Sequence, residues 1–300
     1  MPGRSGPHGI VLLDKALGYS SNQALQQVKR LFRAARAGHT GSLDPLATGM
    51  LPICLGEATK IAGHLLGAHK AYRAEVELGV VTATADREGT VLETRDVPDL
   101  DEAAIERVLS TFRGRIRQRP PAHSALKQGG EPLYLKARRG EEVVVPEREV
   151  EIRRLELVSH IGAKLLIDVE CSTGTYIRSL ARDLGVAFGC GAYLSALRRV
   201  WVEPFLDAPM WTLEALAERD PAGTLAAALL PVDAGLAAWP EVRLDAAETE
   251  RVRHGHEVLR PELDWRGDCR VYGEPGGELL ALGERAADGR VRTRRVFQYG

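Results

Sequence analysis

Two stretches of strict alternation constrain the fold of this chain more than any other feature. Residues 72–78 read YRAEVEL and residues 165–171 read LLIDVEC, with an apolar side chain at every second position. Alternation with a period of two predicts β-strands that are buried on one face. The residues expected on the buried faces are Tyr72, Ala74, Val76 and Leu78 in the first strand and Leu165, Ile167, Val169 and Cys171 in the second.

Further strands and helices are expected between Gly9 and Gly185. Segments 9–14, 51–55 and 143–158 predict strands. Ser20 and Gln23 form a capping-box pattern that predicts a helix from Ser20 until Gly38. Helices are also expected over 57–66, over 101–112, and after Cys171, where Ser and Thr caps start a helix that stops at Gly185. We therefore expect a mixed α/β (α+β) fold, with a largely antiparallel sheet flanked by helices.

The last sixty or so residues have a different texture. After Pro231, short apolar segments alternate with Gly, Pro and Asp. This pattern is typical of a small β-barrel that follows a linker. We expect one domain over residues 1–236 and a second over residues 237–300.

Basic residues cluster although the net charge is only −1. Residues 113–154 hold eleven Lys and Arg against six acids, and residues 176–199 hold four Arg against one acid. A single charged run is usually a solvated surface, but two basic runs favour an anionic partner. The Pro- and Gly-rich part of the first run predicts a long loop, here called the basic arm, over about 113–145, and loops of that length are usually functional.

Several classes of protein are excluded. Apolar runs such as 224–232 are too short to span a bilayer, and the N-terminal MPGRSGPHG lacks the apolar core of a secretory signal. We therefore expect a cytoplasmic protein. The four cysteines lack C-x-x-C spacing, so neither a zinc site nor a disulfide framework is expected.

Asp44 stands alone in GHTGSLDPLATGMLPICLGEATK, residues 38–60. Pro45 disfavours helical backbone at the preceding residue, so Asp44 is expected on a turn or extended segment. Such an acid commonly makes a turn or caps a helix. Here apolar neighbours would desolvate the carboxylate, a cost that a reactive site tolerates when a cation pairs with it. Arg178 is the best candidate for that cation, and the alternative is that Arg178 is a surface residue of its helix.

Three other residues each have more than one interpretation. Tyr72 and Tyr176 are either core aromatics or faces on which an unpaired base stacks. His39 is a general acid or base, a stacking residue or an ordinary turn histidine. A metal role for His39 is disfavoured because no further ligands accompany it at a suitable spacing.

The motifs resemble those of a known family. The segment from Gly38 to Lys60 resembles the signature of the TruB family of tRNA pseudouridine synthases. The resemblance extends over nearly the whole chain, through LLDKALGYSSN, KAYRAEVELG, RPPAHSALKQGGEPLYLKAR, CSTGTYIRSLARDLG and LRRVWVEPF. Where the family commonly reads LDKP, this chain has Ala16 after Lys15, which affects only the geometry of that turn.

The resemblance implies a pseudouridine synthase fold with a PUA-like RNA-binding barrel at the C-terminus. It implies an isomerase that converts the T-loop uridine-55 of tRNA to pseudouridine, without a metal or a small-molecule cofactor because the product is an isomer. The implied partner is tRNA, bound by a monomer, and a second role as a tRNA-folding chaperone is compatible with it.

The resemblance also implies catalytic roles. Asp44 would be the nucleophile toward a flipped-out uridine, Arg178 would pair with it, and Tyr72 would stack under the base and take part in proton transfer. Whether Asp44 attacks the ribose or the uracil ring stays open.

Four residues would bind substrate. Tyr176 and Leu197 would line the pocket, and His39 would occupy or support the space that the flipped base leaves. Lys15 would contact RNA or support the catalytic loop.

Two other functions fit part of the pattern. A non-catalytic RNA-binding protein would keep its affinity for RNA when Asp44 is replaced by Asn. A hydrolase with an aspartyl nucleophile would keep its turnover when residues 113–140 are deleted.

Overall fold

The computed structural model describes residues 6–121, 127–128, 131–132, 139 and 145–299. At its centre lies an 8-stranded sheet with the order β1-β3-β12-β4-β11-β10-β7, and β2 pairs with β3 beside this path. Neighbouring strands are antiparallel except β12 and β3, which are parallel. The expected largely antiparallel sheet is confirmed. Its strands are β1 (Gly9–Lys15), β2 (Ala37–His39), β3 (Ala47–Leu55), β4 (Lys70–Leu78), β7 (Gly114–Gln118), β10 (Arg148–Ile161), β11 (Lys164–Cys171) and β12 (Ala192–Val202).

One face of this sheet is covered by helices. The alternating apolar residues of β4 and β11 are buried on that face, as their sequence predicts. They pack in one core with α1 (Ser21–Leu31), α3 (Glu102–Ser110) and α5 (Ile177–Ala187). The opposite face of β4 and β11 carries charged residues such as Arg73 and Asp168, which pair there through two hydrogen bonds of 2.8 Å. The alternation with a period of two therefore corresponds to strands with one face buried in the core and one face exposed to solvent.

β3 differs because both of its faces are buried. Leu51, Ile53 and Leu55 join the helix-covered core, while Met50 and Cys54 join a second core on the other side. This second core includes the short helices η1 (Gly56–Lys60) and α2 (Ala62–Leu66), which lie where a single helix over 57–66 was expected. A strand buried on both faces needs a continuous apolar run, and LPICL is one.

Two expected helix ends were wrong. α1 ends at Leu31, not at Gly38, because Arg33 has φ 52 and Ala37–His39 pair with β3 as a strand. α5 has no side-chain cap at Tyr176 and continues through Gly185 to Ala187. A Cβ at Gly185 would lie 2.1 Å from the backbone nitrogen of Ala192, so this glycine allows close approach of β12 and does not end the helix.

Smaller elements complete the large domain. They are β5 (Val80–Thr82) with β6 (Val91–Thr94), α6 (Leu213–Arg219), η2 (Leu225–Ala228), η3 (Ala234–Leu236) and the two-residue strands β8 (Lys127–Gln128) and β9 (Glu131–Pro132). Most of the basic arm lies outside the described residues. The strand expected over 143–158 is β10, which runs from Arg148 to Ile161, and residues 143 and 144 also lie outside the described part. Within that part, no helix has the length and apolar character needed to cross a membrane.

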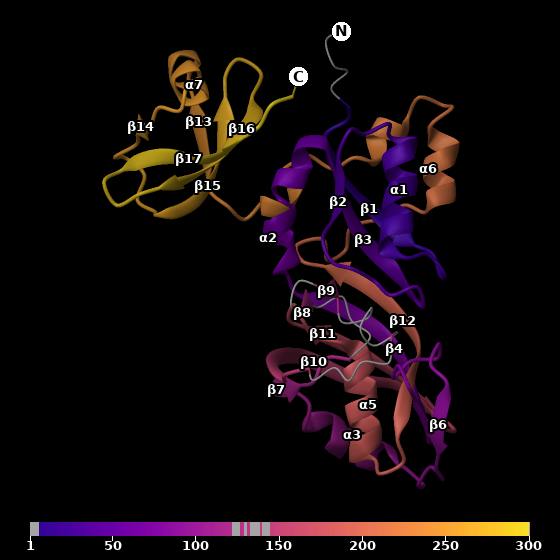
Figure 1. Cartoon of the computed structure of the whole chain (residues 1–300). Helices are drawn as coiled ribbons and strands as arrows, with labels where there is room; N and C mark the ends of the chain where they lie inside the picture. The colour runs from indigo at the N-terminus through magenta and orange to yellow at the C-terminus, as the bar shows by residue number, and fades with distance from the viewer. Residues whose placement is uncertain (1–5, 122–126, 129–130, 133–138, 140–144, 300) are drawn as a thin grey trace.

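The C-terminal residues form a separate lobe, yellow in Figure 1. A 5-stranded sheet has the order β13-β15-β16-β17-β14, and α7 (Ala246–Arg253) contacts both edge strands. The expected small β-barrel is therefore a half-barrel. Its strands are β13 (Glu241–Leu244), β14 (Val258–Leu259), β15 (Gly267–Gly273), β16 (Glu278–Arg285) and β17 (Arg290–Val296).

The C-terminal lobe is fixed to the large domain by apolar and polar contacts. Leu279, Leu282 and Phe297 belong to the second core, beside residues of β1 and β3. Glu57 of η1 accepts a hydrogen bond of 2.8 Å from the backbone nitrogen of Gln298, and Lys60 donates to the carbonyl oxygen of Val296 at 2.8 Å. These contacts orient the lobe relative to the large sheet.

Candidate active site

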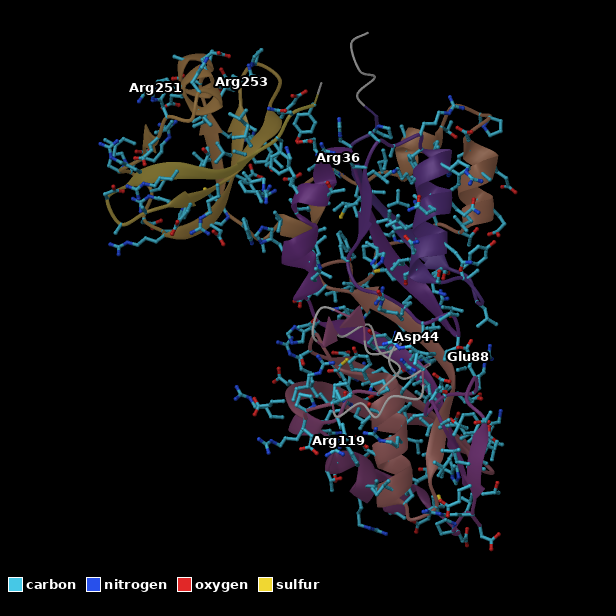
Figure 2. The ribbon with its side chains drawn as sticks, in the orientation of Figure 1. Arg36, Asp44, Glu88, Arg119, Arg251 and Arg253 are labelled. Carbon is cyan, nitrogen blue, oxygen red and sulfur yellow. The ribbon has the colours of Figure 1, made fainter. Side chains whose placement is uncertain are left out.

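Asp44 lies on the loop between β2 and β3, near the middle of the molecule (Figure 2). Ser21, at the start of α1, holds this loop because its hydroxyl accepts from the backbone nitrogen of Leu43 at 2.7 Å and donates to the carbonyl oxygen of Leu43 at 3.0 Å. The carbonyl oxygen of Pro45 accepts from the backbone nitrogen of Gly18 at 2.8 Å. Asp44 is therefore bracketed by anchored neighbours, and Pro45 keeps it out of a helix.

Arg178 pairs with Asp44, as expected. Its Nε lies 3.0 Å from Oδ2 of Asp44, and its Nη1 donates to Oδ2 of Asp86 at 3.1 Å. The Arg178 and Asp86 side chains are only 7% and 3% exposed, whereas that of Asp44 is 43% exposed. One buried arginine thus joins a buried carboxylate to an accessible one, so Arg178 is not a surface residue of α5.

The expected desolvation of Asp44 is present but partial, since its side chain is 43% exposed. Partial burial still raises the pKa of this carboxyl above its ordinary value. The cations Arg178 and Lys15 oppose that rise, and the negative charge of Asp86 adds to it. The accessible carboxylate faces a cavity that a substrate can fill.

That cavity has a volume of about 350 Å³ and is lined by Asp44, Tyr72, Tyr176, Arg178 and Leu197 among other residues. Five residues that the sequence singled out therefore meet at one place, although they come from the Asp44 loop, β4, α5 with its N-cap, and β12. Burial raises the pKa of Tyr72, so its phenol stays protonated at neutral pH. The cavity has the aromatic walls that an unstacked base would contact.

Lys15 and His39 do not line this cavity. Lys15 is 1% exposed, and its ammonium donates to the carbonyl oxygens of Tyr19 at 2.6 Å and Ala16 at 3.0 Å. Burial lowers its pKa to about 8. Lys15 thus holds the turn over 16–19, which contacts the Asp44 loop through the bond from Gly18 to Pro45. His39 lies half-buried on β2, where burial lowers its pKa.

The sequence did not single out Asp86, Arg199 or Lys70 as residues of the site. Asp86 is the buried partner of Arg178, Arg199 lies on β12 and lines the cavity, and Lys70 precedes Tyr72 on β4 and also lines it. Burial lowers the pKa of Lys70 to about 8. Asp86 belongs to a polar turn that no local pattern marks as functional, whereas Arg199 stands in LRRVWVEPF, a motif that could have flagged it.

Arg199 holds the two ends of the Asp44 loop. It is 1% exposed, and its guanidinium donates to the carbonyl oxygens of Met50 at 2.6 Å and Gly41 at 3.1 Å. At Gly49 a Cβ would lie 2.1 Å from the carbonyl oxygen of Arg199, so only glycine lets β12 approach β3 this closely. The parallel pairing of β12 with β3 therefore places Arg199 beneath the Asp44 loop.

The basic run over 176–199 is largely neutralised inside the fold. Arg178 pairs with two acids, Arg198 donates to both oxygens of Asp14 at 2.9 and 2.7 Å, and Arg182 pairs with Asp183 at 2.8 Å. Of the four arginines in this run, Arg178 and Arg199 line the cavity, whereas Arg182 and Arg198 pair with acids elsewhere.

Comparisons with known proteins agree with this geometry. The model described as TruB family pseudouridylate synthase (N terminal domain) matches residues 29–177. The models for the tRNA pseudouridylate synthase B C-terminal domain and for the C-terminal part of pseudouridine synthase II TruB match residues 178–237 and 240–297.

Curated relatives match over nearly their full length. Proteins named tRNA pseudouridine synthase B are 54% identical in Xanthomonas oryzae pv. oryzae, over 97% of this chain and 94% of the relative, and 46% identical in Pseudomonas putida, over 98% and 97%. A solved chain from an H/ACA RNP bound to a substrate RNA containing 2'-deoxyuridine superposes with a TM-score of 0.73 and 26% identity, over 97% of this chain and 85% of that one. The expected pseudouridine synthase fold is thereby confirmed. The chain belongs to the TruB family of pseudouridine synthases, which are isomerases of RNA uridine.

Proposed function

We propose that this chain converts a uridine of tRNA to pseudouridine, that the target is the T-loop uridine-55, and that Asp44 is the nucleophile. The observation that carries the proposal is the Asp44 carboxylate, which lies at an aromatic-walled cavity with Arg178 3.0 Å from it. The relatives named tRNA pseudouridine synthase B, at 46–54% identity, support tRNA as the substrate.

Arg178 keeps the nucleophile ready. Its positive charge lowers the pKa of Asp44 against the effects of burial and of Asp86, which favours the ionised carboxylate. Because Asp86 and the buried guanidinium are fixed, the Asp44 carboxylate is held in position before the substrate arrives. This preorganisation reduces the reorganisation that the reaction would otherwise require.

The reaction breaks the glycosidic bond between ribose C1' and uracil N1 and forms a bond from C1' to carbon 5 of the same base. Asp44 attacks either C1' or the uracil ring, and in both cases its bond to the substrate breaks again before the product leaves. The proton on carbon 5 is lost and one is gained at N1, so atoms and electrons balance without a co-reactant. Tyr72 and Tyr176 hold the detached base by stacking, and the protonated Tyr72 phenol serves as a hydrogen-bond donor.

The remainder of the chain binds RNA in this proposal. The domain over 1–236 flips the uridine into the cavity, its basic arm over about 113–145 clasps the T-loop, and the PUA-like domain over 237–300 contacts the same tRNA. A cytoplasmic monomer without cofactor is sufficient for this activity.

Replacement of Asp44 by Asn tests the proposal. An unmodified tRNA transcript is incubated with the protein, and pseudouridine is then located by sequencing. We expect pseudouridine at position 55 with the native protein and none with Asp44→Asn, while the affinity for tRNA stays nearly unchanged. Asp168→Asn is the matched control, because Asp168 also pairs with an arginine but lies on the opposite face of the sheet. Pseudouridine formed by Asp44→Asn, or formed at another position by the native protein, would contradict the proposal.

A further inference from the structure

Arg148 is a cation of the cavity that the proposed mechanism does not use. It is the first residue of β10 and pairs in register with Gln118, the last residue of β7. The segment between these two residues, 119–147, includes most of the basic arm. Arg148 therefore lies at the root of the arm and also lines the active-site cavity.

The position of Arg148 is determined by its neighbours. Its guanidinium carbon lies 4.8 Å from the centroid of the Tyr176 ring, a cation–π contact. Tyr176 is itself fixed, because the Gln118 side chain accepts from its backbone nitrogen at 2.8 Å and donates to its carbonyl oxygen at 3.0 Å. Gly174 lies against the same guanidinium, since a Cβ there would be in van der Waals contact with Nη1 of Arg148 at 3.4 Å.

The charge of Arg148 has no acidic partner within the described part of the chain. Its Nε and Nη2 are buried, and among the described residues they meet no hydrogen-bond acceptor. The adjacent acids are engaged elsewhere, since Glu147 pairs with Arg119 and Glu149 pairs with Arg115. Buried charged donors without an acceptor are costly, and a binding site tolerates that cost when a ligand supplies the acceptor.

We infer that Arg148 binds a backbone phosphate of the nucleotide that enters the cavity. The inference rests on the proposed function, because it takes the ligand to be RNA. A guanidinium presents paired donors that match two phosphate oxygens, and phosphate supplies the missing negative charge. Because the guanidinium covers one face of Tyr176, only the other face is left for a base. Arg148 is thus a substrate-positioning residue, distinct from Arg178, whose charge is satisfied by two carboxylates.

The test combines protein variants with neutral phosphate analogues. The substrate is an RNA stem-loop with a uridine at the target position, and a methylphosphonate replaces one phosphate at a time on either side of that uridine. With Arg148→Gln we expect kcat/KM to fall by about 10- to 100-fold, the range for loss of a charge-assisted hydrogen bond. The slope of log affinity against log salt should decrease by about one phosphate contact. Arg148→Lys should retain part of the activity and the slope, because it keeps the charge but loses the paired donors.

Arg153→Gln is the matched control, since Arg153 lies on the same strand, is 51% exposed and pairs with Glu151 at 3.7 Å. At one of the two linkages, the methylphosphonate should slow the native protein and the Arg153 variant alike but leave Arg148→Gln unaffected. Thermal unfolding of each variant shows whether it is folded.

The outcomes separate the two proposals. If the native protein forms no pseudouridine in the stem-loop, the proposed function fails and this inference fails with it. If the native protein is active and Arg148→Gln is equally active, or is slowed by the methylphosphonate as much as the native protein, only this inference is wrong. If Arg148→Gln is less active than the native protein but is slowed by the methylphosphonate as much, Arg148 contacts another part of the substrate, for example a uracil oxygen.

Discussion

Replacing Asp86 by Asn should destabilise the fold far more than replacing Asp44 by Asn, although both carboxylates bind the same arginine. The two side chains differ in exposure, at 3% for Asp86 and 43% for Asp44. Asp86 also accepts hydrogen bonds from the Thr84 hydroxyl and, at 3.0 Å, from the backbone nitrogen of Glu88. The carboxylate of Asp86 therefore closes its turn as well as pairing with Arg178.

The magnitude follows from these environments. Breaking a buried ion pair costs about 3–5 kcal/mol because a charge is left without compensation. In Asp86→Asn the guanidinium keeps Asp44 as a partner, so the lower end applies, about 3 kcal/mol. A solvent-exposed pair contributes only about 0.2–1 kcal/mol, which is the loss expected for Asp44→Asn. For a domain of this size, Tm should fall by about 6–12 °C in Asp86→Asn and by less than about 4 °C in Asp44→Asn.

Thermal unfolding by calorimetry, together with pseudouridine formation, measures both effects. We expect Asp44→Asn to be nearly as stable as the native protein and inactive. We expect Asp86→Asn to be much less stable, with residual activity at temperatures where it is folded. Equal destabilisation by the two substitutions would refute the reasoning that the buried Asp86 stabilises the fold while the accessible Asp44 serves the chemistry.

Three further predictions concern the same framework. Protonation of Asp44 removes the nucleophile as pH falls, and Arg178 lowers the pKa of Asp44 while Asp86 raises it. In single-turnover rates, Arg178→Gln should therefore move the acid limb of the pH–rate profile to higher pH, and Asp86→Asn should move it to lower pH. Arg199→Lys should lower kcat more than tRNA affinity and reduce stability by about 2 kcal/mol, because the bonds to the carbonyl oxygens beneath the Asp44 loop are lost; kinetics and urea unfolding test this. Glu57→Gln should weaken docking of the C-terminal lobe, and limited proteolysis would detect this as faster cleavage near the C-terminus. Unchanged cleavage would show that the apolar contacts alone fix the lobe.

Local sequence was sufficient to predict those features of the fold that depend on residues close together in the chain. The alternation of 72–78 gave the buried face of β4, since a strand that lies on a core must place its apolar residues at every second position. The capping box at Ser20 and Gln23 located the start of α1, because both hydrogen bonds of that motif lie within four residues. The end of α1 was misplaced because pairing of Ala37–His39 with β3, a contact distant in sequence, competes with the helix.

The role of Gly185 likewise depends on tertiary packing and not on local sequence. Gly185 has the local appearance of a helix stop, yet it lies inside α5, where the first residues of β12 approach its backbone. A glycine that ends a helix and a glycine that admits a neighbouring strand are identical in sequence, so only the packed structure distinguishes them.

The sequence by itself determined the sheet faces, the start of α1, the family and five of the residues that meet at the cavity, because motif and periodicity are properties of the chain. The tertiary structure alone decided that Asp44 is half-exposed, that Asp86 is the second partner of Arg178, and that Arg148 lines the cavity without an acidic partner among the described residues. Burial and charge pairing depend on which segments the fold brings together, and in this chain those segments are far apart in sequence: 92 residues separate Asp86 from Arg178, and 158 separate Gly41 from Arg199. Electrostatics of the site therefore had to be read from the structure, since the interaction between charges depends on their distance and exposure and not on their order along the chain.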